Sequence, residues 1–198
     1  RETSKKKGSK SPDATSTAKQ ESTSAAIFEH ALTRKSDGWQ TVDKFRNDKQ
    51  VKKIIREGTN RHKNPYPEAY DDPDNDWIEV FYKQHKTILH RLQDSRISEF
   101  TREGGFMDYI SKAVGKLGVT KKDNWNPADI WGTRGSDAEV TEKIDFAIEG
   151  DGKATQTIQQ LNSLLRGMYK SKELIGISLK KTSGKEALWE EYNIEQLT

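Results

Sequence analysis

The sequence predicts an α/β protein in which a mixed central β-sheet is flanked by helices. Residues 77–92 and 155–169 have the apolar spacing of amphipathic helices, and residues 173–181, which follow the second of these, have the composition of an apolar strand. From residue 106 the expected order is helix, strand, strand, helix, strand, helix, which is typical of a sheet covered by helices. Three regions are predicted: a tail at 1–25, a helical arm with a proline-rich loop at 26–75, and the α/β domain at 76–198.

Residues 1–25 are rich in Ser, Thr and Lys and contain almost nothing apolar. Such a segment cannot bury enough of its own surface to offset the entropy lost on ordering, so we expect disorder in isolation. A partner surface would be needed to hold it, which indicates a role in assembly. The first 22 residues hold six Lys or Arg and three Asp or Glu, which leaves 28 of each for the rest. Only local clusters of charge can therefore indicate a nucleic-acid partner.

The segment from Ala25 to about Gly58 is expected to form one or two short helices packed on the body. Its apolar positions are irregularly spaced among many charges: Trp39, Val42, Phe45, Ile54 and Ile55. Residues 59–75 carry three prolines and a run of acids, which predicts a loop.

Residues 77–92 are predicted to form an amphipathic helix. At 100° per residue its apolar side chains share one side, namely Trp77, Val80, Phe81, Ile88 and Leu92. His85 borders that side, so we expect it to be packed. A second helix is expected at 106–117, closed by Gly118 as a C-cap.

The remaining elements follow in order along the chain. Short strands are predicted at 128–131 and 143–149. Residues 155–169 have the clearest helical spacing, and residues 173–181 have the clearest strand composition. A last helix is predicted from Lys185 to about Glu195.

Composition excludes several kinds of chemistry. The chain has no cysteine, which excludes disulfides and thiolate metal sites. No apolar run approaches the roughly 18 residues of a membrane span, so no membrane partner is expected and the protein is predicted to be soluble.

Two segments place polar residues where strands are usually apolar. Asp129 lies between apolar neighbours, where an acid costs desolvation energy unless it is paired or binds a cation. Because side chains alternate along a strand, one face of the later strand carries Ile175, Ile177 and Leu179, and the other carries Gly176, Ser178 and Lys180. If the two strands are neighbours, Ser178 and Lys180 point together towards whatever Asp129 faces.

This pair of segments resembles the PD-(D/E)XK nuclease superfamily, whose motif is an acid on one strand and an acid-x-Lys on the next. Here Pro127-Ala128-Asp129 stands for the Pro-Asp element, and Ser178-Leu179-Lys180 stands for acid-x-Lys. An alanine is inserted, and a serine replaces the second carboxylate, which leaves a weak cage for a divalent cation. The resemblance implies a restriction-endonuclease-like fold with Asp129, Ser178 and Lys180 in its catalytic site.

Some restriction enzymes of this superfamily also carry serine at that position, with a long spacer and a carboxylate supplied by the following helix. Fifty residues lie between Asp129 and Lys180 in this chain, and the predicted last helix comes next. On that helix Glu191 and Glu195 lie on the inward side and are the expected compensating ligands, whereas Glu190 points away.

The resemblance implies that Mg²⁺ is held by Asp129, one of these glutamates and the carbonyl of Leu179. The ion would polarise the scissile phosphate, while Lys180 would orient and acidify the attacking water. Asp145 and Glu149, on one face of the expected middle strand, are alternative metal ligands.

The chain is locally basic around Lys180, which suits a phosphate backbone without specifying bases. The expected DNA-binding residues are Arg166, Lys170, Lys172, Lys181 and Lys185. A plainer interpretation stays open beside this one: Asp129 braces the turn after Pro127, and Lys180 and Lys181 are ordinary solvated charges at the end of a strand.

The first functional hypothesis is a metal-dependent DNA endonuclease, or a nuclease-like domain, that hydrolyses phosphodiester bonds. The segments NWNPADIW and ELIGISLKKTSGKEA also look like uncharacterised bacteriophage proteins, which predicts a location in the cytoplasm of a bacterial host or in the virion. The alternative is a virion structural or head-completion protein that keeps an inactive nuclease-like fold. Such a protein would be anchored to other virion proteins through residues 1–25.

Overall fold

A computed structural model describes residues 14–34, 38–92, 94–102, 108–110, 112, 128–135, 137–149, 158–181 and 187–192 of the chain. A four-stranded sheet is formed by β1 (Ile97–Thr101), β2 (Ile130–Arg134), β3 (Leu174–Lys181) and β4 (Ala187–Tyr192). The strands lie in the order β1-β2-β3-β4, and each neighbouring pair is antiparallel. The predicted α/β class is confirmed, but the sheet is not mixed within the described residues.

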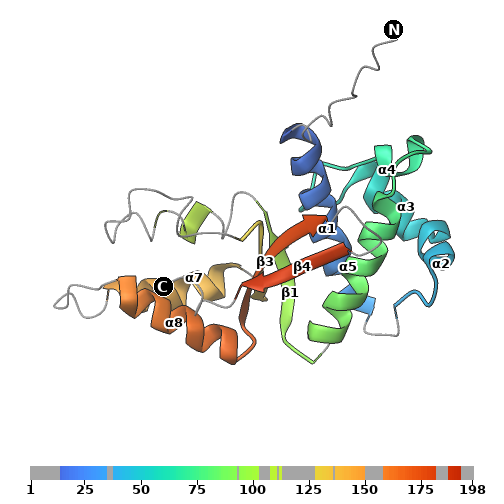
Figure 1. The fold of residues 1–198 in the computed structure, drawn as a ribbon. Coiled ribbons are helices and arrows are strands. Elements are labelled where there is room, and N and C mark those ends of the chain that lie inside the picture. The colour runs from blue at the N-terminus through green and yellow to red at the C-terminus, as the bar shows by residue number, and fades with distance from the viewer. Residues whose placement is uncertain are drawn as a thin grey trace, which may run out of the picture.

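Helices cover both faces of this sheet, as predicted (Figure 1). On one face lie α1 (Ala14–Arg34) and α5 (Trp77–Leu92), which share an apolar core with the sheet. On the other face lie α7 (Asp137–Glu149) and α8 (Ile158–Lys170), which share a second core with it. The sheet is therefore the middle layer of three.

The predicted alternation along β3 is confirmed where side chains are described. Ile175 and Ile177 belong to the core under α1 and α5, whereas Leu174 belongs to the core under α7 and α8. Gly176 lies on the latter face, where a Cβ would be 3.3 Å from the ring of Trp131. The missing side chain at Gly176 thus makes room for a large indole on the neighbouring strand.

Three further helices pack on the outer side of α1 and α5. They are α2 (Val42–Asn47), α3 (Lys49–Glu57) and α4 (Glu68–Asp71). Thr41 caps α2 by accepting a hydrogen bond from the backbone of Lys44, and Asp48 caps α3 in the same way. Short helices were expected here, but α4 adds one turn inside the predicted loop at 59–75.

Helix α1 overturns part of the expected tail. It begins at Ala14, and its small polar residues Ser22, Thr23 and Ser24 are buried where it packs on α5 and β1. The Ser24 hydroxyl donates to the side-chain oxygen of Gln84 at 2.9 Å, which satisfies it without water. The prediction of disorder is therefore wrong for residues 14–25, while residues 1–13 lie outside the described part.

The predicted strand at 143–149 is wrong, because these residues form the second half of α7. Val140 and Ile144, four residues apart, are both buried against the sheet. Phe146, which a strand would place on the same face as Ile144, is 80% exposed. The helical spacing, and not the alternation of apolar residues, sets the buried face.

The predicted last helix at 185–195 is also wrong over its described part. Residues 187–192 form β4, which pairs with β3 in register from Gly176↔Tyr192 to Lys181↔Ala187. Of the helix expected at 106–117, only residues 108–110 and 112 are described, and they are helical.

Strand β1, which the predicted elements omit, is an edge strand fastened to α1. The backbone N–H of Phe100 donates to Glu29 Oε1 at 2.9 Å. The same oxygen lies 3.0 Å from His62 Nε2 and 3.1 Å from Arg61 Nε. Glu29 therefore joins α1, the segment before α4 and the edge of the sheet.

Candidate functional site

Asp129 immediately precedes β2. It lies at the end of the sheet that also contains the last residues of β3. Its backbone N–H donates to the carbonyl of Ile177 at 2.8 Å, and Ile130 then pairs with Ile177. The strand predicted at 128–131 thus begins two residues later than expected. The expected neighbourhood of the two motif strands is confirmed, because β2 and β3 are paired.

The carboxylate of Asp129 is directed at the backbone of β3. Oδ2 accepts a hydrogen bond from the N–H of Leu179 at 2.7 Å and a longer one from the hydroxyl of Ser178 at 3.3 Å. Ser178 is buried, at 8% exposure, whereas Asp129 is half-buried. Asp129 and Ser178 are therefore brought together, as the motif requires.

Lys180 lies on β3 two residues beyond Ser178, and so on the same face of the sheet by strand alternation. Only its backbone position is described. In register it is opposite Leu188 of β4. The backbone thus places an acid and a lysine on adjacent strands and on one face, which is the arrangement that the sequence predicts.

Of the two glutamates expected as the second carboxylate, only Glu191 is described, and it lies on β4 and not on a helix. In the β3–β4 register Glu190 is opposite Ser178, and Glu191 is opposite Ile177, whose side chain faces the other core. Paired residues of antiparallel strands share a face. The expected helical setting of Glu191 is therefore wrong, and the residue of β4 that lies opposite Ser178 is Glu190, while Glu195 lies outside the described residues.

Asp145 does not join this site. It lies on α7, not on a strand, and its Oδ1 accepts a hydrogen bond from the hydroxyl of Tyr109 at 2.5 Å. Glu149, its expected companion, ends the same helix. Across the described ranges, no three His, Asp or Glu side chains are grouped so that they could hold a metal ion.

The expected DNA-binding residues do not form one patch. Lys170 ends α8 and Lys172 precedes β3, whereas Lys180 and Lys181 lie at the far end of β3. The six steps of extended strand from Leu174 to Lys180 alone span roughly 20 Å, which keeps Lys172 far from Lys180. Arg166 lies one turn before Lys170 on α8 and is half-buried, and Lys185 is outside the described residues.

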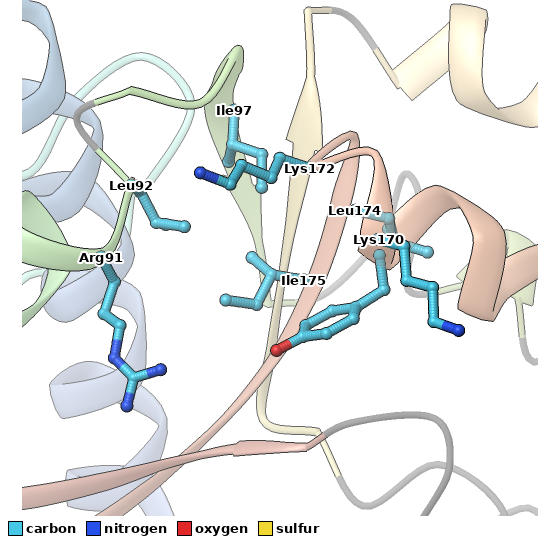
Figure 2. Close-up of a pocket in the computed structure, with 8 residues that line it drawn as sticks. Arg91, Leu92, Ile97, Lys170, Lys172, Leu174 and Ile175 are labelled. Atoms are coloured by element: carbon cyan, nitrogen blue, oxygen red, sulfur yellow. The ribbon is translucent and has the colours of Figure 1, made fainter.

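Lys170 and Lys172 instead line a pocket with a volume of about 250 Å³ at the beginning of β3. Its third cationic residue, Arg91, comes from the last turn of α5 and was not singled out from the sequence. Figure 2 shows Arg91 on one side and Lys170 on the other, with Ile175 between them. The remaining lining is apolar or aromatic: Leu92, Ile97, Tyr169, Leu174 and Ile175.

Lys172 has an unusual backbone. Its φ is 57°, and it is the one non-glycine residue with positive φ among the residues that the structure describes. Its N–H donates to the carbonyl of Tyr169, and the N–H of Glu173 donates to that of Met168, which together form a Schellman cap on α8. Glycine is preferred at this position, because a Cβ in the left-handed region costs roughly 1 kcal/mol.

Comparison of the chain with protein-family models, with curated proteins and with solved structures found no match. None of the helices in the described part of the chain has the length and apolar character needed to cross a bilayer.

Proposed function

We propose that the protein is a metal-dependent DNA endonuclease of the PD-(D/E)XK type, with a restriction-endonuclease-like core and its site at Asp129 and Lys180. The observation that carries the proposal is the contact of the Asp129 carboxylate with β3 at Ser178 and Leu179. This contact holds the Asp129 carboxylate against Leu179, which is the residue before Lys180 on β3.

The donors at this place suit Mg²⁺, which prefers oxygen ligands. A carboxylate offers about four lone-pair sites, so the two bonds at Oδ2 of Asp129 leave capacity for a cation. The register adds Glu190 opposite Ser178, and the carbonyl of Leu179 is a third oxygen beside them. Bound there, Mg²⁺ would supply charge stabilisation for a scissile phosphate.

The protein groups have separate roles in this proposal. Asp129 and Glu190 bind the ion, and the hydroxyl of Ser178 positions the Asp129 carboxylate through its hydrogen bond. Lys180 carries the positive charge that orients a water beside the phosphate and favours its deprotonation.

The test is a plasmid-nicking assay with Mg²⁺, comparing wild type with Asp129→Asn, Lys180→Ala and the remote control Lys53→Ala. Asparagine keeps an oxygen that can accept from Leu179, so this variant removes charge without removing the brace. Nicking by wild type and by Lys53→Ala, with at least a tenfold loss in the other two, supports the proposal. Equal nicking by all four, or none by wild type, contradicts it.

A second candidate is a virion structural protein with an inactive nuclease-like fold, and one observation supports the inactive fold. The bond from Leu179 to Asp129 gives that acid a structural use that needs no metal. Wild-type protein that folds cooperatively, binds no Mg²⁺ by calorimetry and cuts no DNA is the result that selects this candidate.

A further inference from the structure

We propose that the pocket at the beginning of β3 binds one nucleotide unit of single-stranded nucleic acid. The phosphate would lie at the cationic rim, which Arg91, Lys170 and Lys172 form on different sides of the pocket, and the base would lie on the apolar floor. This inference rests on the proposed function for the class of polymer. The pocket is distinct from the Asp129 site, because it lies at the other end of β3.

Charge is the first argument. Three cationic residues line the pocket, and no acidic residue does so within the described part of the chain. They come from separate elements, the end of α5 and the end of α8 with its cap, so the cluster is made by the fold and not by one basic segment. Phosphate oxygens are the anionic groups that such a cluster of Arg and Lys attracts most strongly in nucleic acids.

A neighbouring hollow of about 370 Å³ extends the basic surface past Lys172. Arg96 and Arg134 line it together with Asp94 and Glu173. Glu173 is already bound, since Lys143 and Ser171 donate hydrogen bonds to it and lower its pKa, and Arg134 Nη1 lies 3.6 Å away. The three cationic and two acidic residues that line the hollow leave one net positive charge there, which continues the basic surface beyond Lys172.

The floor of the pocket is the second argument. Leu92, Ile97 and Ile175 offer aliphatic surface, and Tyr169 adds an aromatic side chain to the lining. A base in a duplex is stacked and paired, so only an unpaired base can reach such a floor. The volume of about 250 Å³ is slightly below the range of about 300–1,000 Å³ typical of small-molecule sites, so the pocket has room for no more than one nucleotide unit.

The backbone of Lys172 is the third and independent argument. The Schellman position would be more stable with glycine, yet it holds a lysine that borders both hollows. Residues kept in unfavourable backbone conformations cluster at functional sites. The proposal explains why the chain keeps a charged side chain there.

The first experiment measures binding of a fluorescently labelled ten-nucleotide oligo-dT by anisotropy, with EDTA present and in the Asp129→Asn background. Lys170→Glu/Lys172→Glu changes the pocket, and Lys52→Glu/Lys53→Glu on α3 makes the same change in net charge at exposed positions outside the pocket. We expect at least a tenfold loss of affinity for the first pair and less than threefold for the second. Equal losses, or no binding by the parent protein, overturn the proposal.

The second experiment uses Lys172→Gly, which removes the side chain and relieves the backbone. We expect a higher Tm together with weaker oligo-dT binding and a smaller salt dependence, by about 0.7 in the logarithmic slope for one lost phosphate contact. Unchanged binding in this variant contradicts the proposal. Lys172→Arg, which keeps the charge, should retain binding.

Two competitors define the ligand. Displacement by dTMP shows that one nucleotide fills the pocket, and weak competition by a duplex of the same length shows the preference for unpaired bases. A duplex that competes as well as the single strand overturns the inference. Because no step needs cleavage, oligo-dT binding without nicking separates this proposal from the proposed nuclease activity.

Discussion

The backbone N–H of Leu179 donates to the carboxylate of Asp129 at 2.7 Å, so an acid ahead of β2 serves as acceptor for the neighbouring strand. The bond continues the β2–β3 pairing beyond Ile130, where β2 begins. The same side chain is therefore part of the sheet and part of the proposed site. Stability and activity can be separated there by substitutions that keep or remove the acceptor.

Asp129→Ala removes the acceptor and is expected to destabilise the fold by about 1–2 kcal/mol, because the amide of Leu179 loses its partner in a half-buried place. Asp129→Asn keeps an acceptor oxygen and should lie within about 0.5 kcal/mol of wild type. Urea denaturation followed by circular dichroism measures both values. If asparagine destabilises as much as alanine, the charge and not the hydrogen bond is what matters.

The β3–β4 register provides a matched pair of neighbouring glutamates. Glu190 is opposite Ser178, and Glu191 is opposite Ile177. We expect Glu190→Gln to lower Mg²⁺-dependent nicking at least tenfold and Glu191→Gln to leave it within threefold of wild type. The assay is repeated over a range of Mg²⁺ concentrations. The reverse order of effects would place the missing carboxylate on the other face of β4.

Gly132 lies where two strands and the α1/α5 core meet most closely. A Cβ there would be 2.7 Å from Ile175 Cγ2 and 2.9 Å from Phe100 Cε1. Gly132→Ala should therefore destabilise the fold by about 1–3 kcal/mol through overpacking. Gly167→Ala is the control, because nothing lies within 4 Å of its added Cβ, and on helix α8 it should stabilise by about 1 kcal/mol. A neutral Gly132→Ala in thermal melts would mean that the strands can separate at no cost.

His85 confers a pH dependence on stability. It is fully buried among aromatic rings, stacked on Phe45 at a centroid distance of 5.3 Å and in contact with Trp39, as expected for a packed histidine. Burial lowers its pKa from the ordinary 6.5 to about 4. Between pH 6.5 and pH 4 the imidazole of His85 is protonated in the unfolded chain but neutral in the folded chain. Its contribution to the free energy of unfolding is therefore fully present above pH 6.5 and is lost as the pH falls to 4.

The loss due to His85 should approach about 3 kcal/mol at pH 4. His85→Phe keeps an aromatic ring and removes the titration, so its stability relative to wild type should rise by this amount between pH 7 and pH 4. The exposed His90→Gln on the same helix is the control and should follow wild type. Parallel pH curves for wild type and His85→Phe, from urea melts, would refute this account.

Long, strongly periodic segments were predictable from the sequence. Residues 77–92 form α5 with the expected bounds, and β3 lies within one residue of its prediction. In both cases burial of one regular face decides the structure. The pairing of Asp129 with Ser178 followed from the same alternation, together with the assumption that the two strands are neighbours.

Other elements could not be predicted, for physical reasons that differ between them. In α7 the residues from Ile144 onward alternate like a strand, and only Val140, one turn earlier, reveals the helix. In β1 the register shift after Ile97 turns both Ile97 and Phe100 to one core, which removes the alternation that identifies strands.

The pocket at the beginning of β3 could not be predicted, because tertiary contacts bring its residues together and no local sequence pattern indicates them. Arg91 and Lys172 are far apart in sequence, and they line the same pocket because α5 and α8 end at the same part of the sheet. Lys170 and Lys172 are close to Lys180 in sequence but distant in space, because an extended strand separates residues faster than a helix does. Proximity along the chain was therefore a poor measure of the basic surface.

The bond between Glu29 and Phe100 also limits how far the sheet can grow. The Phe100 amide belongs to an edge strand, and such outward amides are the groups to which a strand from another molecule adds. Burial raises the pKa of Glu29, but its bonds with His62 and Phe100 and the charge of Arg61 outweigh this and keep its pKa below the ordinary value. The carboxylate thus stays ionised in mild acid and keeps this outward amide engaged, so that a strand of another molecule would have to displace Glu29 before it could pair with Phe100.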